Sequence, residues 1–131
     1  MNWFSSVAAG FAVIAIITAA SAVNAAPTDY EFQPVAAEVK KGAGSEVAVR
    51  LVHKPSGKPV EDAIIVRTRL DMSPDSMGMM MAKHTAMPSG EPGIYRFNAD
   101  FTMAGGWAFK LQAKVPRESE TIEGTVVFQA K

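Results

Sequence analysis

The sequence predicts an all-β protein, an antiparallel immunoglobulin-like β-sandwich of about seven strands that follows an apolar N-terminal segment. Short stretches alternate apolar and polar side chains, and no stretch keeps the 3.6-residue period of a helix. Clusters of Gly, Pro and Ser separate these stretches at intervals of roughly 8–12 residues, as in immunoglobulin-like sandwiches. A small closed barrel is the alternative architecture.

Residues 1–23 contain no charged side chain and no proline, and they end in a run of small residues. Val23-Asn24-Ala25 suits a signal peptidase, so we expect residues 1–25 to be a signal peptide cleaved after Ala25. No Lys or Arg precedes Lys40, which is unusual for a signal peptide. An uncleaved anchor at residues 3–23 is the alternative, because about 20 apolar residues span a bilayer. Both predict an extracytoplasmic domain, which we expect in the periplasm.

Residues 26–33 are expected to form a linker, and residues 34–131 a single domain. Strands are predicted near 45–53, 63–72, 94–101, 107–115 and 121–129, where alternation is clearest. The alternation assigns inward-facing side chains to all five strands. They are Val49, Leu51, Val66, Leu70, Tyr95, Phe97, Trp107, Phe109, Leu111 and Phe128.

Composition excludes several functions. The chain has no cysteine, so it has no disulfide, thiolate metal site or cysteine nucleophile. Its 13 basic and 13 acidic residues all follow residue 26, which leaves a neutral domain without the basic surface that nucleic acid requires. No phosphate loop, zinc-helix motif or serine elbow is present. We therefore do not expect an enzyme.

The segment 71–87 is the most informative part of the chain, because six of the eight methionines lie in it. Thioether sulfur is a soft, neutral ligand that suits Cu(I) or Ag(I) better than hard cations. Unlike a thiolate, it does not form disulfides in an oxidising compartment. The candidate metal ligands are Met77, Met79, Met81, His84 and Met87.

An extended backbone would place Met77, Met79 and Met81 on one face, with Met80 and His84 on the other. A turn at Gly78 would relax this separation. Two other interpretations remain open, because methionine also fills gaps in cores and forms adaptable docking surfaces. Likewise, His84 is either a ligand or an ordinary surface or hydrogen-bonded histidine. We interpret His53, which ends a strand beside a turn, as structural.

Three short motifs, read in order, resemble the YtkA-like domains and more loosely the FixH-like proteins. They are Met-Gly-Met-Met-Met at 77–81, Gly-Ile-Tyr at 93–95 and Met-Ala-Gly-Gly-Trp at 103–107, and the resemblance covers residues 32–128. It implies an exported or membrane-tethered immunoglobulin-like sandwich, associated with heavy-metal efflux or with copper delivery to respiratory oxidases. It implies no particular ligand set. FixH-like proteins usually keep an anchor, so cleavage after Ala25 would favour the YtkA-like side.

The expected function is an extracytoplasmic accessory protein that binds or passes Cu(I) or Ag(I) in metal efflux or in oxidase copper supply. An alternative is an interaction module whose Met-rich segment docks onto a membrane transporter or oxidase subunit without metal. A plain structural domain is the third possibility. Trp107 is expected in the core beside turn-forming glycines, although Met103 would add a sulfur if it lay near the other methionines.

Overall fold

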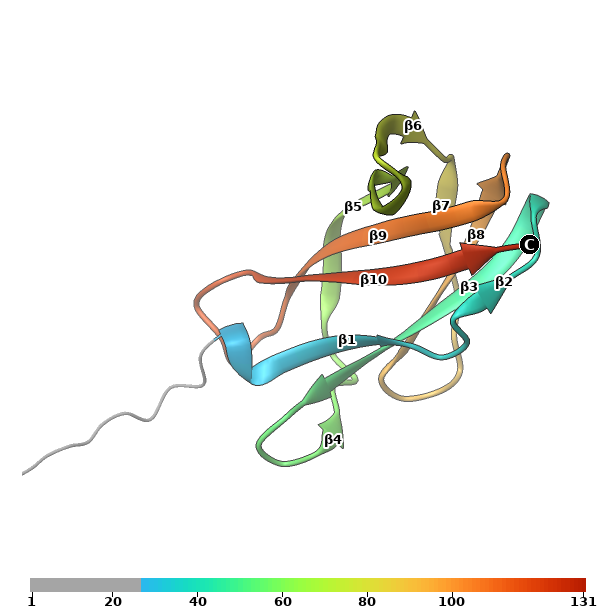
Figure 1. The fold of residues 1–131 in the computed structure, drawn as a ribbon. Coiled ribbons are helices and arrows are strands. Elements are labelled where there is room, and N and C mark those ends of the chain that lie inside the picture. Colours follow the sequence, from blue (N-terminus) through green and yellow to red (C-terminus); the bar gives the residue numbers. More distant parts are fainter. Residues whose placement is uncertain (1–26) are drawn as a thin grey trace, which may run out of the picture.

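The structure, a computed structural model, describes residues 27–131, so the predicted signal peptide or anchor lies outside the described residues. The described part is all-β, with two 3₁₀ turns and no α-helix (Figure 1). It contains no helix long and apolar enough to span a bilayer. The elements are η1 Pro27–Asp29, β1 Tyr30–Pro34, β2 Glu38–Val39, β3 Gly42–His53, β4 Lys58–Pro59, β5 Ile64–Met72, η2 Ser73–Asp75, β6 Met77–Met81, β7 His84–Met87, β8 Ile94–Phe101, β9 Gly105–Lys114 and β10 Ile122–Ala130.

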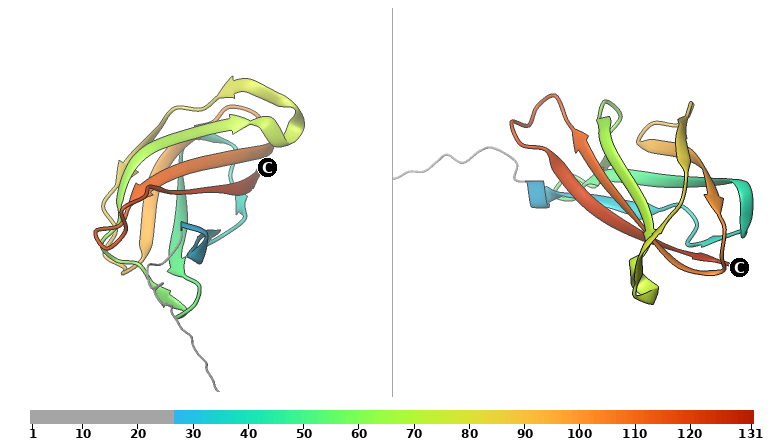
Figure 2. Two further views of the ribbon diagram at one scale, coloured as in Figure 1. Left: turned by 90° about the vertical axis from the view of Figure 1, so that its left-hand side faces the viewer. Right: turned by 90° about the horizontal axis from the view of Figure 1, so that it is seen from above.

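The strands form two sheets that face each other (Figure 2). One sheet has the order β1-β3-β8-β7, with β4 paired to β3, and the other has the order β2-β10-β9-β5-β6. All pairs are antiparallel except β2 with β10. If β1, β3, β5, β7, β8, β9 and β10 are lettered A to G in chain order, the two sheets read A-B-E-D and C-F-G, the immunoglobulin order. The predicted all-β, immunoglobulin-like sandwich is confirmed for the described residues, and the short strands β1, β2, β4, β6 and β7 had no range assigned from the sequence.

The hydrophobic core lies between the two inner faces. Phe97 of β8 meets Phe109 of β9 edge-on, with ring centroids 4.8 Å apart, and Phe101 meets Trp107 at 5.7 Å. Most of the predicted inward-facing side chains are buried, and Tyr95 is half-buried against them. The alternating pattern was therefore a reliable guide in β3, β8, β9 and β10.

Val66 was predicted to face the core, and this is wrong: its side chain is 48% exposed. The register of β5 on β9 shifts between Ile65 and Arg67, so Val66 is an extra residue in a β-bulge. The bulge changes the phase of the strand, and Ile65 and Leu70 face inward on either side of it.

The linker assigned to residues 26–33 also needs correction, because Tyr30–Pro34 forms strand β1 on the edge of β3. Tyr30 and Phe32 are buried. Phe32 packs against Gly124, where an added Cβ would lie 2.6 Å from the phenyl ring. The domain therefore begins before residue 34, and five residues with only two apolar side chains were too short a signal to reveal it.

Candidate functional site

Residues 77–81, which form β6, are called here the methionine bulge. They pair with β5 only at their two ends, Met77 with Met72 and Met81 with Asp71. Because Met72 and Asp71 are adjacent, residues 78–80 have no counterpart on β5 and protrude from the sheet edge. The segment is therefore not a regular extended strand, so the separation of Met77, Met79 and Met81 from Met80 that an extended backbone would impose does not apply.

The side chains of the methionine bulge face solvent. Met79 is 92% exposed and Met81 57%, and Met77 and Met80 are each more than a third exposed. Met72, five residues before Met77, is completely buried in the core. Core packing therefore accounts for Met72 but not for the four methionines of the bulge.

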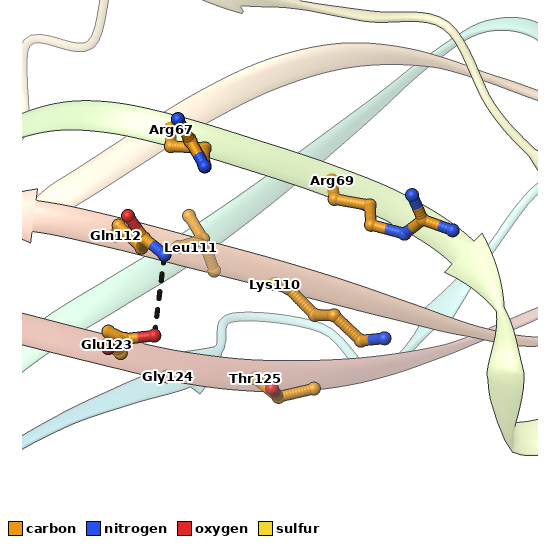
Figure 3. Close-up of a pocket in the computed structure, with 8 residues that line it drawn as sticks. All are labelled: Arg67, Arg69, Lys110, Leu111, Gln112, Glu123, Gly124 and Thr125. Atoms are coloured by element: carbon orange, nitrogen blue, oxygen red, sulfur yellow. Dashed lines mark hydrogen bonds between the residues drawn. The ribbon is translucent and has the colours of Figure 1, made fainter. Parts of the chain in front are cut away.

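A buried carboxylate anchors the base of the methionine bulge. Asp71 accepts hydrogen bonds from Arg69 Nε at 2.5 Å, Lys110 Nζ at 3.2 Å and the Ser73 amide at 3.0 Å. Arg69 also donates through Nη2 to the carbonyl oxygen of Gly78 at 2.8 Å, inside the bulge. Arg69 and Lys110 extend along neighbouring strands toward the C-terminal end of β5 (Figure 3). We call Asp71, Arg69 and Lys110 the clamp.

The charge state of Asp71 follows from these contacts. Burial by itself would raise the pKa of its carboxyl group, because it disfavours the ionised form. The hydrogen bonds from Ser73, Arg69 and Lys110 together outweigh burial and hold the pKa well below its ordinary value. Asp71 is therefore ionised at neutral pH, and the clamp is a stable ion-pair cluster.

The turn η2 attaches the bulge to the sheet from the other side. Asp75 accepts a hydrogen bond from the Gly106 amide at 3.1 Å. An added Cβ at Gly105, whose φ is +133°, would lie 2.4 Å from Asp75 Oδ2, so glycine is needed there. The Gly-Gly-Trp motif thus makes room for Asp75, while Trp107 donates its indole N–H to the Met103 carbonyl at 3.0 Å.

The Gly-Ile-Tyr motif also has a structural role. Gly93 has a φ of +76°, and an added Cβ there would lie 2.4 Å from the Cβ of Pro59. The Tyr95 hydroxyl donates to the Val60 carbonyl at 2.8 Å and accepts from the Ala63 amide at 3.1 Å. This fixes the connection into β5, and burial raises the pKa of the Tyr95 hydroxyl.

The two ring nitrogens of His84 are both engaged. Nδ1 lies 3.0 Å from the Ala82 carbonyl, which only accepts, so Nδ1 carries the proton. Nε2 then accepts from the Thr68 hydroxyl at 2.6 Å and joins β7 of one sheet to β5 of the other. A metal ion could bind His84 only by displacing Thr68. His53 contacts Ser56 Oγ at 2.8 Å, in keeping with a structural role.

Met87 is placed away from the methionine bulge. It lines a cleft of about 180 Å³ together with Ile65, six residues before Asp71 on β5. Six residues of strand span about 20 Å. Met77, Met79 and Met81 thus lie on one exposed segment, His84 begins β7 with both ring nitrogens engaged, and Met87 lies at the far end of β7. Among residues 27–131, no three His, Asp or Glu side chains gather into a metal-binding group.

Several contributors to the site were not predicted from the sequence. Met80 is exposed on the bulge. Arg69, paired with Asp71, holds the bulge in place through the Gly78 carbonyl. Their alternation with Arg67 along β5 resembles an ordinary solvent-facing row, so it did not mark Asp71 as buried.

Beside the clamp, the outer face of the β5-β9-β10 sheet forms a shallow pocket of about 450 Å³ (Figure 3). Polar side chains line most of it: Arg67, Arg69, Lys110, Gln112, Glu123 and Thr125.

The described chain is an immunoglobulin-like β-sandwich that presents exposed, anchored methionines at one sheet edge. It belongs to the YtkA-like family, whose profile matches residues 24–112, and this confirms the resemblance seen in the sequence motifs. Two similar solved structures are the filamin domain of Lin-41 and the C-terminal domain of ZirS. The first has 14% identity and a TM-score of 0.43, with 79% of this chain and 92% of that chain covered.

The ZirS domain has 10% identity and a TM-score of 0.44, with 97% of this chain and 87% of that chain covered. A comparison with curated proteins found no match.

Proposed function

We propose that this protein is an extracytoplasmic accessory protein that binds or passes Cu(I) or Ag(I) through its methionine bulge, in metal efflux or in copper supply to an oxidase. The observation that carries the proposal is the exposure of four methionines on one anchored segment of five residues. A contiguous group of exposed apolar side chains on a soluble domain usually marks a binding site. The cluster of exposed methionines at one sheet edge therefore indicates a function at this surface.

The anchoring supports exchange of a metal ion with a partner. The clamp and Asp75 hold the backbone at the base of the bulge, while the thioether side chains are exposed to solvent. Neutral sulfur ligands select soft ions without introducing charge. Exposed ligands also let a partner's donor atoms approach the ion before the first ones leave. Met77, Met79 and Met81 are the proposed ligands. We include Met80 as a fourth candidate, because it is exposed on the same segment.

Competition for Cu(I) against a chromogenic chelator under reducing conditions tests the proposal. The double substitution Met79→Leu/Met81→Leu nearly conserves volume, so it should cost less than about 1.5 kcal/mol of stability. It removes two donor sulfurs and should abolish competition. Met87→Leu, at a methionine that the structure places away from the bulge, is the matched control and should compete like the parent protein. A parent protein that takes no Cu(I) or Ag(I) from the chelator would refute the proposal.

Zn(II) gives a second control for the chemistry of the ligands. Zn(II) sites use Cys, His and carboxylate ligands, and the bulge supplies none of these. Zn(II) should therefore bind much more weakly than Cu(I) and should be unaffected by the Met79→Leu/Met81→Leu substitution. Equal loss of both ions would point to a change in the fold and not to lost sulfur ligands.

A docking module is the second candidate function, favoured by the absence of charge on the bulge itself. Leucine preserves an apolar contact surface, so binding of a membrane transporter or oxidase subunit through this surface would survive Met79→Leu/Met81→Leu. Metal binding would not survive this substitution.

The intact mass of the protein from the periplasmic fraction tests the proposed location. Cleavage predicts a chain that begins at Ala26, whereas a full-length mass in the membrane fraction supports the anchor.

A further inference from the structure

We propose that the methionine bulge is a site of reversible oxidation by peroxides, in which Met79 and Met81 form sulfoxides first while Met72 is protected. The proposal uses the same segment as the proposed function, but the oxidation step does not depend on metal binding. Only its effect on metal affinity rests on that function.

The exposure of each methionine sets the order of reaction. A peroxide must reach a lone pair on sulfur, and Met79 is almost fully open to solvent, followed by Met81. Met72 is buried in the core, so its sulfur becomes accessible only when the domain opens locally. Methionines of one chain therefore differ widely in access, and the bulge concentrates the reactive ones.

The chemistry is a two-electron oxygen transfer. The sulfur lone pair attacks one oxygen of hydrogen peroxide, the O–O bond breaks, and an S–O bond forms. The departing oxygen leaves as water after proton transfer. Sulfur is oxidised by two electrons and the peroxide is reduced by two. A methionine sulfoxide reductase reverses the step with electrons from a thiol.

The fold tolerates oxidation of the bulge because backbone pairing and the side chains of Arg69 and Asp75 hold it, and no thioether takes part in these contacts. The backbone is held by Arg69 on the Gly78 carbonyl and by Asp75 on the Gly106 amide. A sulfoxide oxygen on Met79 would point into water, where it is hydrated. On Met72 it would enter the core, where this side chain is completely buried and no water can hydrate the new oxygen. Oxidation at the bulge is therefore compatible with the native structure.

Oxidation also changes the ligand chemistry of the bulge. A sulfoxide coordinates hard ions through oxygen and has lost the soft thioether that suits Cu(I) or Ag(I). If the bulge holds a soft ion, peroxide switches that site off and a reductase restores it. A bound ion would in turn occupy the sulfur lone pairs and slow the oxidation.

Peptide mapping by mass spectrometry after timed exposure to dilute hydrogen peroxide tests the site. Met79 and Met81 should be oxidised at least about tenfold faster than Met72, which reacts only through opening. Circular dichroism should be unchanged after two oxygens are added, and sulfoxide reductase with dithiothreitol should restore the original mass. Comparable rates at Met72 and Met79, or unfolding after the first oxygen, would overturn the proposal.

Two further measurements separate this proposal from the metal function. Met79→Leu/Met81→Leu should lose the fast phase of oxygen uptake, whereas the Met87→Leu control should keep it. Ag(I) competition is then measured before oxidation, after it, and after reductase treatment. Loss and recovery of Ag(I) binding support the switch. Ordered oxidation in a protein that never binds Ag(I) refutes the metal function and the switch, and it leaves the oxidation site supported.

Discussion

The two ends of β5 have opposite surroundings. At its C-terminal end, Leu70 and Met72 are buried, Asp71 is held by the clamp, and β6 continues the sheet. Toward its N-terminal end, β5 pairs with β9 alone among the described strands, and Val66 bulges into solvent. The difference teaches that a strand with similar residue types along its length can be buried and held by ion pairs at one end and partly exposed at the other. The methionine bulge is attached to the end that the clamp holds.

Leu70→Ala should give the largest effect, because it removes most of a fully buried side chain next to Asp71, at the end of β5 that the clamp holds. We expect a loss of about 2–5 kcal/mol in the free energy of unfolding, measured by denaturant titration. A loss below 1 kcal/mol, which is about the scale of an exposed site, would show that this end is not better packed than the other.

Asp71→Asn should cost about 1.5–3 kcal/mol, because it weakens charge-assisted hydrogen bonds to Arg69 and Lys110. Both cations are partly exposed, so solvent holds the cost at the lower end of this range. Amide hydrogen exchange at Met77 and Met81, which pair with β5, should accelerate more than exchange in β3. Uniform acceleration across the domain would contradict a local clamp.

The pH dependence of stability should report the same carboxylate. The pKa of Asp71 is lower in the folded state than the ordinary value of about 3.9 expected for the unfolded chain. Its contribution is therefore fully present above that value and is lost as pH falls toward the folded pKa. Asp71→Asn should flatten the decline in stability below about pH 4. An unchanged decline would mean that other carboxylates cause it.

His84→Gln should cost about 1–2 kcal/mol, since it disturbs the hydrogen bonds to Thr68 and to the Ala82 carbonyl. Cu(I) affinity should change by less than about threefold, because that cost falls on the hydrogen bonds joining the two sheets and not on the bulge. A large loss of Cu(I) affinity in a folded variant would instead return His84 to the ligand set.

Val66→Ala should have the smallest effect, within about 0.5 kcal/mol, as is usual for exposed sites. Its contrast with Leu70→Ala compares two apolar positions of one strand under the same conditions. A cost comparable to that of Leu70→Ala would mean that Val66 is covered in solution, for example by a partner chain. The exposed bulge at the N-terminal end of β5 would then be an interface.

Much of the fold follows from the sequence alone. Phe97, Phe109 and Phe128 lie in three separate stretches in which apolar and polar side chains alternate. This pattern predicts strands with one buried face, and the glycine and proline clusters between them predict turns. The unusual density of methionines between residues 71 and 87 was equally visible. These features are local, because neighbouring residues carry the whole signal. The absence of cysteine and the neutral charge are likewise properties of composition that folding does not change.

Tertiary structure decided which methionines are exposed and which polar residues hold them. Met72 and Met79 look alike in sequence, yet one is in the core and the other in water. The difference arises because the Met72 side chain packs into the core cluster at the end of β5, whereas residues 78–80 have no counterpart on β5 and protrude from the sheet edge. Asp71 meets Lys110, 39 residues away, only because β5 and β9 pair in one register. Such contacts depend on register, and register is set by the whole sandwich and not by any single segment.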